Sequence, residues 1–335
     1  MKILLIVGLL FVVVGSGVSQ SEDLEASDKP SQNASDEFSY YERDRPLFQM
    51  NWNSGSEDCS TNDQPPIEVL AFSSSTYVLR QNKCIHFEAP FIYILFGEHT
   101  VLVHDTGATG SSKEFPLYKT VSTLINERRQ LGYPKTQTIL VTHSHSHRDH
   151  TSADLQFRNQ PNVTLIEPKK EAILNYFGIS NWPNQSATID LGARELKIIP
   201  TPGHQEESIS IYDPQTQWML TGDTFYPGIV YVKNWQTYKS SIKRLVDFSK
   251  DYQVSLLMGS HIEMTNRDGV AYPIGATYQP DEAALPLQLE DLYQLHAALE
   301  ESGEKARSMT FGNLIVTPMN VFQKAIGGVL KWLTQ

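Results

Sequence analysis

The most informative part of the chain is the stretch Thr138-Ile139-Leu140-Val141-Thr142-His143-Ser144-His145-Ser146-His147-Arg148-Asp149-His150. It opens with a β-branched, apolar run that is typical of a buried strand. Four histidines and one aspartate then fall within eight residues. Imidazole and carboxylate groups are ligands for zinc and other borderline divalent ions. A closed structural site uses four ligands, so this cluster offers too many donors for one ion.

Four further short motifs also come directly after apolar runs that are typical of strands. Rigid scaffolds commonly place functional groups in such positions. The motifs are Val103-His104-Asp105-Thr106-Gly107, Thr201-Pro202-Gly203-His204, Thr221-Gly222-Asp223 and Gly259-Ser260-His261.

The five motifs, taken in order, resemble those of the metallo-β-lactamase superfamily, whose signature is H-x-H-x-D-H. The terminal Asp149-His150 pair fixes the register, and the resemblance covers roughly residues 65 to 265. Several spaced motifs in order are far more specific than one alone. The resemblance implies an α/β fold, the four-layer αβ/βα sandwich, with two mixed β-sheets and helices outside.

The resemblance also implies two metal ions at the loop edge of the sheets. Zinc is the expected ion, and iron or manganese also suits these donors. One ion is bound by His145, His147 and His204, the other by Asp149, His150 and His261, and Asp223 bridges both.

The residues next to these ligands depart slightly from the family pattern. Thr normally precedes the first ligand, and here Ser144 does, while Thr142-His143 lies two residues earlier. The extra His143 is either a group that supports the ligands or a ligand in a shifted register. The shifted register loses the Asp-His spacing, so we interpret His143 as binding no metal, with a polar loop residue as the simplest alternative. By the resemblance, Asp105 orients the metal loop through hydrogen bonds instead of binding an ion. His104, next to Asp105, is equally compatible with a supporting role of this kind and with no role in the site.

The remaining histidines carry no motif. We expect His86, His99 and His296 to lie on the surface or in loops.

This ligand set predicts a hydrolase. Two cations a few ångströms apart lower the pKa of a shared water from 15.7 towards about 7, and the resulting hydroxide attacks a carbonyl. Asp149 would orient that hydroxide and carry a proton to the leaving group. Tyr226 lies three residues after Asp223, as in the acyl-homoserine-lactone hydrolases, where a tyrosine donates to the substrate carbonyl. Simple packing of the Tyr226 ring is the competing interpretation.

The bridging aspartate resembles that of glyoxalase II and the lactonases, so an ester, lactone or thioester is the expected substrate. β-Lactam hydrolysis is the alternative. A di-iron redox protein of this fold is disfavoured, because the residues after His261 leave no room for a flavin domain. A binding protein with a relict site is disfavoured, because the ligand set is complete. Glyoxalase II holds glutathione through basic C-terminal residues, whereas the segment 285–296 is acidic. The segment 263–280 is expected to form a pocket wall or an ordinary capping loop.

The net charge of the chain limits the classes of molecule that it is expected to bind. The formal net charge of -11 argues against nucleic acid, because binding to phosphates requires Lys and Arg. A small molecule is the expected partner, and nothing in the sequence determines the oligomeric state.

The first residues are typical of a secretory signal. Lys2 precedes the apolar run 3–14, and Gly17 and Ser19 have the spacing of a cleavage site. The run is too short to span a bilayer, so no stable membrane insertion is expected once 1–19 is removed. The predicted organisation is a signal peptide at 1–19, a flexible acidic, Ser-rich linker at 20–45, and one hydrolase domain with a C-terminal helical extension at 46–335. The protein is thus expected to be secreted or periplasmic.

Two cysteines and three sequons bear on the same compartment. Cys59 and Cys84 favour a disulfide in an oxidising environment, with two unrelated core residues as the alternative. Asn33, Asn162 and Asn184 begin N-x-[ST] sequons, which matter only in a eukaryote.

Periodicity predicts alternating strands and helices. Helices are expected at about 117–131, 169–176, 238–252 and 287–299, and a short amphipathic stretch ends the chain. Strands are expected at 67–72, 77–80, 91–96, 100–104, 138–141, 163–166, 187–191, 196–200, 209–212, 218–220, 254–258 and 314–317.

Overall fold

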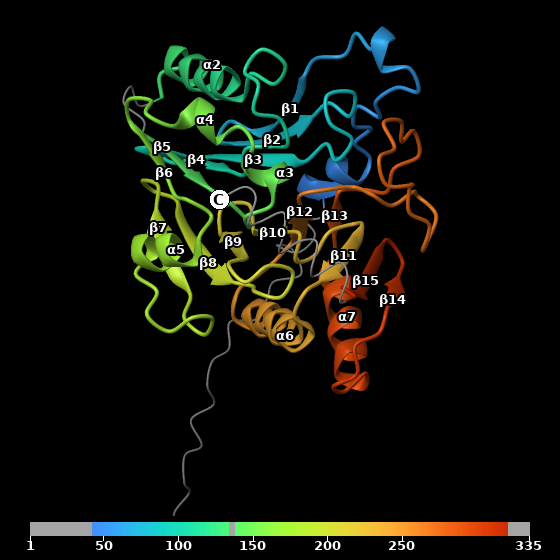
Figure 1. The fold of residues 1–335 in the computed structure, drawn as a ribbon. Helices are drawn as coiled ribbons and strands as arrows, with labels where there is room; N and C mark the ends of the chain where they lie inside the picture. Colours follow the sequence, from blue (N-terminus) through green and yellow to red (C-terminus); the bar gives the residue numbers. More distant parts are fainter. Residues whose placement is uncertain (1–41, 134–137, 321–335) are drawn as a thin grey trace, which may run out of the picture. The chain divides into compact units, whose positions relative to one another are not determined.

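The computed structural model describes residues 42–133 and 138–320 (Figure 1). The expected signal segment, most of the expected linker and the C-terminal amphipathic stretch lie outside the described residues. Residues 42–48 are helical, and Leu47 is buried in the core. The last residues of the expected 20–45 linker therefore belong to the folded domain.

The first sheet has six strands in the order β1-β2-β3-β4-β5-β6. Successive strands from β1 to β4 pair antiparallel, whereas β4, β5 and β6 run parallel to one another. The strands are β1 (Ile67–Ser73), β2 (Thr76–Gln81), β3 (Phe91–Phe96), β4 (Thr100–His104), β5 (Thr138–Thr142) and β6 (Val163–Leu165).

The second sheet also has six strands, in the order β13-β12-β10-β9-β8-β7. Only β10 and β12 pair in parallel, so this sheet is mixed as well. The strands are β7 (Ala187–Asp190), β8 (Glu195–Pro200), β9 (Ile209–Asp213), β10 (Trp218–Gly222), β12 (Leu256–Gly259) and β13 (Pro286–Leu287). A smaller sheet is formed by β11 (Ile229–Val232), β15 (Leu314–Pro318) and β14 (Met309–Phe311).

The helices lie on the outer faces of the two large sheets. Figure 1 shows α2 and α4 above the first sheet and α6 and α7 below the second, with α3 where the two sheets meet. The helices are α2 (Leu117–Gln130), α3 (Arg148–Thr151), α4 (Asp154–Phe157), α5 (Lys170–Phe177), α6 (Trp235–Asp251) and α7 (Leu289–Glu301), and a 3-10 turn η1 spans Cys59–Thr61. The four-layer αβ/βα sandwich is confirmed.

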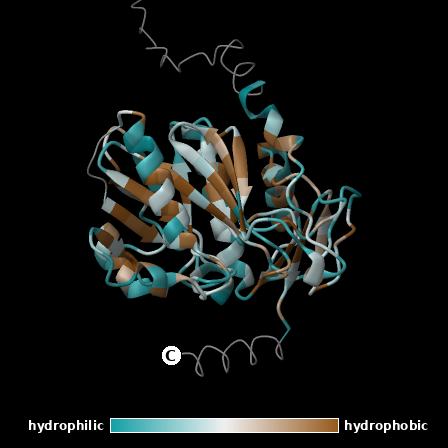
Figure 2. Ribbon diagram, turned by 90° about the horizontal axis from the view of Figure 1, so that it is seen from above, coloured by the Kyte–Doolittle hydropathy of each residue, from teal (hydrophilic) through white to brown (hydrophobic). Residues whose placement is uncertain are grey.

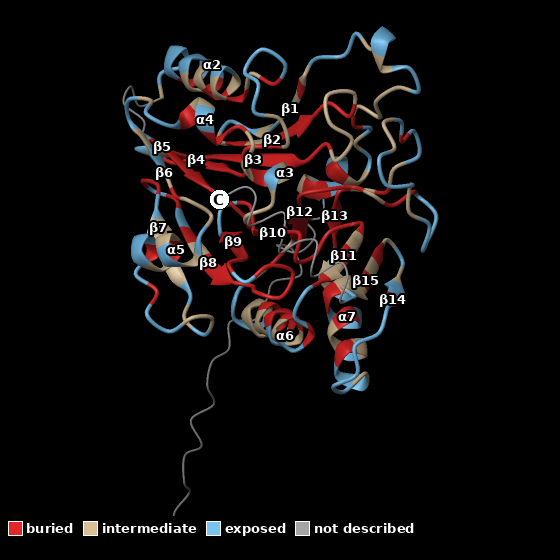
Figure 3. Ribbon diagram, viewed as in Figure 1, coloured by how far each residue is buried: buried red, intermediate tan, exposed pale blue. Residues whose placement is uncertain are grey.

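Strand alternation explains the layers. In β3 the side chains of Phe91, Tyr93 and Leu95 enter the core between the sheets, whereas those of Ile92 and Ile94 enter the core beneath α2. Successive side chains of a strand point to opposite faces, so an apolar run such as Phe91–Phe96 serves two cores at once. A third core packs α6 and α7 against the second sheet. Hydrophobic strands therefore lie between helices whose outer surfaces are polar and exposed (Figures 2 and 3).

Strand direction decides where loops meet. β4 and β5 are parallel, so Asp105 and the histidine-rich stretch leave the first sheet at one edge. In the second sheet β8, β10 and β12 all run in one direction, because β9 is antiparallel to both β8 and β10. In open α/β sheets, sites form at the carboxyl ends of strands.

A buried ion pair fastens the two sheets together at Arg194. The guanidinium donates to the Ser75 and Phe96 carbonyls of the first sheet, at 2.7 and 3.2 Å. It also pairs with Asp213 at the end of β9, at 3.1 and 2.5 Å. Both side chains are only 1% exposed.

The cysteines form a disulfide between Cys59 and Cys84, as expected. Within the described residues, no helix combines the length and apolar character needed to cross a membrane.

Asp213→Asn tests the ion pair between the sheets. Breaking a buried pair leaves an uncompensated charge, so we expect a loss of about 3–5 kcal/mol in the free energy of unfolding, measured by urea denaturation. Asp247→Asn is the matched control, because the Asp247 side chain on α6 is 45% exposed and pairs with Lys243 and Lys250 on the same helix. The control should change stability by less than about 1 kcal/mol. Equal effects of the two substitutions would contradict this role for Asp213.

Candidate metal centre

The predicted ligands leave strand ends of both sheets and come together. His145 and His147 follow β5, and Asp149 and His150 lie in the short helix α3. His204 follows β8, Asp223 follows β10, and His261 follows β12. They form two groups of potential ligand atoms that share one aspartate: His145, His147, His204 and Asp223, and Asp149, His150, Asp223 and His261.

The first group is built around His147. Its Nδ1 lies 2.9 Å from Nε2 of His145 and 3.2 Å from Nε2 of His204. Asp223 Oδ2 lies 3.7 Å from Nε2 of both His145 and His204. Three ring nitrogens and one carboxylate oxygen thus converge on one small volume.

The second group is built around Asp149. Its Oδ2 lies 2.9 Å from Nε2 of His150 and 3.1 Å from Nε2 of His261. Asp223 Oδ1 lies 3.5 Å from the same two nitrogens. The two oxygens of Asp223 therefore face different groups, which is the arrangement a bridging carboxylate needs.

These contacts fit divalent cations. Buried ring nitrogens that face one another at about 3 Å repel unless a proton or a cation lies between them. Asp223 Oδ1 is buried, and no hydrogen-bond donor contacts it among the described residues. Burial and the neighbouring His204 lower the pKa of His147 to about 3, which keeps its imidazole neutral, the form that binds metal.

In three of the ligand rings, the nitrogen that points away from the ligand groups contacts an acceptor. His204 Nδ1 lies 2.8 Å from the Tyr231 carbonyl, and His261 Nδ1 lies 3.0 Å from the Glu88 carbonyl. His150 Nδ1 lies 2.9 Å from Asp105 Oδ2. Such bonds fix the tautomer and orient the free nitrogen towards an ion.

Asp105 organises the metal loop. Its carboxylate accepts from the Ser144 backbone N–H at 2.7 Å and from the Ser144 hydroxyl at 3.0 Å, besides His150. Ser260, next to His261, donates to it at 3.2 Å. Burial opposes its ionisation, but His150 and His104 hold the pKa of Asp105 well below its usual range. Asp105 belongs to neither ligand group, in line with the expected orienting role.

His143 is buried in a polar network, which agrees with a group that supports the ligands and not with a simple polar loop residue. Its Nε2 contacts Asp154 Oδ1 at 2.8 Å, and its Nδ1 contacts the Ile166 carbonyl at 3.1 Å. Thr106 donates to the same Asp154 oxygen at 2.7 Å and to the His150 carbonyl at 3.2 Å. His143 lies outside both ligand groups, and its network reaches the His150 carbonyl of α3 through Asp154 and Thr106.

The other histidines lie apart from the ligand groups. His104 is buried and contacts Thr142 Oγ1 at 2.9 Å, and burial lowers its pKa to about 4. His99 is exposed, and His86 and His296 are half-buried.

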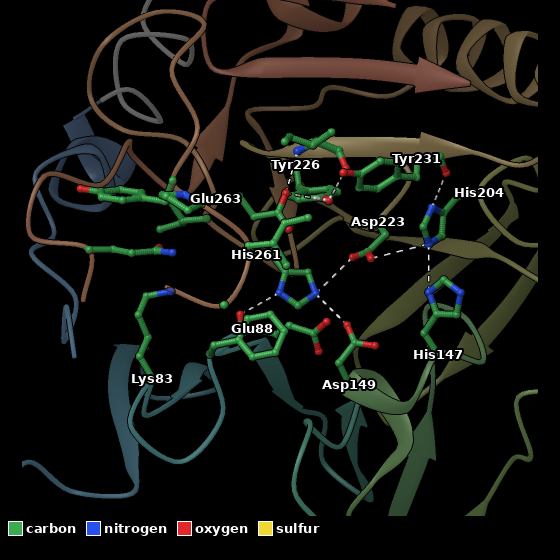
Figure 4. A pocket seen from close by; sticks show the side chains of 18 of the residues that line it. Lys83, Glu88, His147, Asp149, His204, Asp223, Tyr226, Tyr231, His261 and Glu263 are labelled. Carbon is green, nitrogen blue, oxygen red and sulfur yellow. Dashed lines mark hydrogen bonds and ion pairs between the residues drawn. The ribbon is translucent and has the colours of Figure 1, made fainter. Parts of the chain in front are cut away.

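A pocket of about 230 Å³ opens over the two groups. Figure 4 shows Asp149, Asp223, His147, His204 and His261 on one side of it. Tyr272, Pro273, Ile274 and Gln279 line it from the segment 263–280, which confirms that this segment forms a pocket wall.

Tyr226 lines the pocket, but its hydroxyl already has partners. It donates to the Ile229 carbonyl at 2.8 Å and lies 3.2 Å from Glu263 Oε2. Burial and Glu263 raise the pKa of Tyr226 well above its usual value, so the phenol keeps its proton. A substrate carbonyl would have to replace one of these partners. Glu263 was not singled out from the sequence, and only its place two residues after His261 could have drawn attention to it.

Comparison with known proteins identifies the family. Residues 87–257 match the family described as the metallo-beta-lactamase superfamily. The chain belongs to this superfamily.

The relatives that the chain matches in sequence include several hydroxyacylglutathione hydrolases. A hydroxyacylglutathione hydrolase of Legionella pneumophila is 26% identical over 184 residues, which are 51% of this chain and 70% of that protein. One from Rhizobium meliloti is 27% identical over 193 residues, 55% of this chain and 68% of that protein. A third, from Chelativorans, is 33% identical, but the match spans only 33% of its length. A solved metallo-beta-lactamase from Pontibacter korlensis is 17% identical, with a TM-score of 0.45, covering 70% of this chain and 99% of that one.

The two ligand groups predict two divalent ions per chain under metal-replete conditions. Elemental analysis of the purified protein should find close to two, because seven ligands exceed the coordination of one tetrahedral ion. Removal by a chelator should lower the melting temperature, and zinc should restore it, since an ion that binds only the folded chain stabilises it. His204→Ala should lose one ion. One ion or fewer in the unsubstituted protein would contradict the paired site.

Proposed function

We propose that this protein is a secreted or periplasmic hydrolase that uses two divalent ions, normally zinc, to cleave an ester, lactone or thioester. The observation that carries the proposal is the pair of ligand groups that share Asp223, beneath a pocket large enough for a small molecule. All seven predicted ligands are present in these groups. The thioester hydrolases among the relatives support the same class of reaction.

The chemistry depends on how the side chains are placed. Two divalent ions bound by these groups would supply a water of lowered pKa and an electrophile for the substrate carbonyl. Asp149 lines the pocket, so it can accept a proton from the attacking water and deliver it to the leaving group. His150 and His261, which contact Asp149, keep its carboxylate ionised.

The proposed compartment follows from the N-terminal signal pattern, and the Cys59–Cys84 disulfide agrees with it. The substrate carbonyl would sit over the ligand groups, with the remainder of the molecule against the segment 263–280.

An activity panel tests the proposal directly. Nitrocefin, a set of lactones and a set of thioesters would be offered to the zinc-loaded protein and to the chelator-treated protein. Hydrolysis of a lactone, ester or thioester that disappears with the metal is the expected result. Turnover of nitrocefin alone would replace the proposal with a β-lactamase.

Asp149→Asn should remove most of the activity on the best substrate while the protein stays folded. The amide cannot accept the proton, and it is a weaker ligand, so we also expect lower occupancy of the second ion. The measurements are kcat, metal content and the circular dichroism spectrum. Activity at the unsubstituted level would show that Asp149 has been assigned the wrong role.

Tyr226→Phe separates catalysis from packing, because it deletes only the hydroxyl. If the hydroxyl donates to the carbonyl where negative charge develops, kcat should fall about 10²–10³-fold with little change in melting temperature. Lost bonds to Ile229 and Glu263 would instead lower the melting temperature and leave kcat and KM unchanged. That second outcome would make Tyr226 a packing residue.

A further inference from the structure

The wall of the pocket that faces the ligand groups carries a buried cation. Lys83 follows β2, is 1% exposed and lines the pocket. Figure 4 shows it on the side opposite His147 and His204, with its amine directed towards the space between. Buried lysines occur only where something compensates their charge, so the surroundings of Lys83 determine what this wall can bind.

Lys83 shares its nearest carboxylate with Arg80. Arg80 and Glu282 form a two-pronged pair at 2.6 and 2.5 Å. Lys83 Nζ lies 3.3 Å from the Glu282 oxygen that Arg80 already binds more closely. One carboxylate thus faces two cations, and an ammonium with three N–H donors has one long contact in the described residues.

Glu263, a second carboxylate near Lys83, makes its hydrogen bonds with other groups. Glu263 accepts from the Ile229 backbone N–H at 2.7 Å and lies 3.2 Å from the Tyr226 hydroxyl. Burial lowers the pKa of Lys83 to about 8, helped by Arg80 and opposed by Glu282 and Glu263. At neutral pH the amine therefore remains mostly charged.

A second polar group lines the same pocket. Gln279 is 5% exposed, and its Oε1 is buried without a hydrogen-bond partner among the described residues. Its backbone is fixed, because its N–H donates to the Ser54 carbonyl at 2.8 Å. A buried amide without a partner is costly, so the position is suited to a ligand that supplies one. The amide can present either its N–H or its oxygen to such a ligand.

We propose that Lys83 and Gln279 bind a carboxylate that the substrate carries at the end remote from the bond that is cleaved. This inference rests on the proposed function, because it assigns the substrate class of the same pocket. Among Arg80, Lys83 and Glu282, one positive charge lacks a carboxylate of its own, and a carboxylate of the substrate would supply it. Glu88 and Glu263 line the same pocket, so they would oppose a dianion such as a phosphate ester more strongly than a monoanion.

The test compares two thioesters that differ only at this end, the N-acetylcysteamine thioester of glutarate and that of its monomethyl ester. In Lys83→Met, KM for the free acid should rise about ten- to hundredfold, the value of a hydrogen bond to a charged group. KM for the methyl ester should stay within about twofold, and kcat should change little for either. Lys197→Met is the matched control, because Lys197 contacts Glu195 and Thr188 and does not line the pocket.

Direct binding separates this proposal from the proposed function. Zinc-loaded protein would be titrated calorimetrically with glutarate and with monomethyl glutarate. Unsubstituted protein should prefer glutarate, and both Lys83→Met and Lys83→Gln should lose that preference while keeping their metal and their melting temperature. If no ester, lactone or thioester is cleaved, the proposed function fails, and this titration still decides the carboxylate site. Equal binding of the two probes, or equal effects of Lys83→Met on both thioesters, would overturn it.

Discussion

The site depends above all on the buried carboxylate of Asp105. It collects donors from Ser144 and His150 in one half of the sandwich and from Ser260 in the other. A buried charge is stable only when its lone pairs accept hydrogen bonds, so the buried Asp105 carboxylate fixes the positions of the groups that donate to it. Asp105 also has a positive φ of 70°, a conformation that Asp tolerates better than most residues. The turn after β4 is thereby directed into the interior, and the ligand loops of both sheets are fixed around it.

The sequence predicted what depends on local pattern and missed what depends on distant partners. The strands Phe91–Phe96 and Thr100–His104 were predicted with the bounds observed, because β-branched runs bounded by turn residues identify buried strands. The ligand groups followed from the resemblance of the spaced motifs to those of the metallo-β-lactamase superfamily. By contrast, β11 and β14 are three or four residues long and pair only within a small third sheet, so neither periodicity nor length revealed them.

The same limit applies to the polar networks. The contact between His143 and Asp154 spans eleven residues, and that between Arg80 and Glu282 spans 202. A charged residue in a sequence is normally assigned to the surface, and only the fold shows that Lys83 is enclosed. The pocket consequently has two walls of different origin. One wall consists of the ligand groups, whose residue types follow from what a divalent ion binds. The other carries Lys83, whose role depends on where the fold places it.

Each ligand group draws on both sheets, which makes assembly of the centre a late event. His145 and His147 come from the first sheet and His204 from the second, and Asp149 and His150 likewise need His261 and Asp223. A chain in which only one sheet has folded holds two of the four donors of either group, so it binds ions far more weakly than the native chain. Ion uptake therefore reports that the two sheets have docked correctly. A chain that crosses a membrane unfolded would acquire its metal only on the far side, from whatever supply that compartment offers.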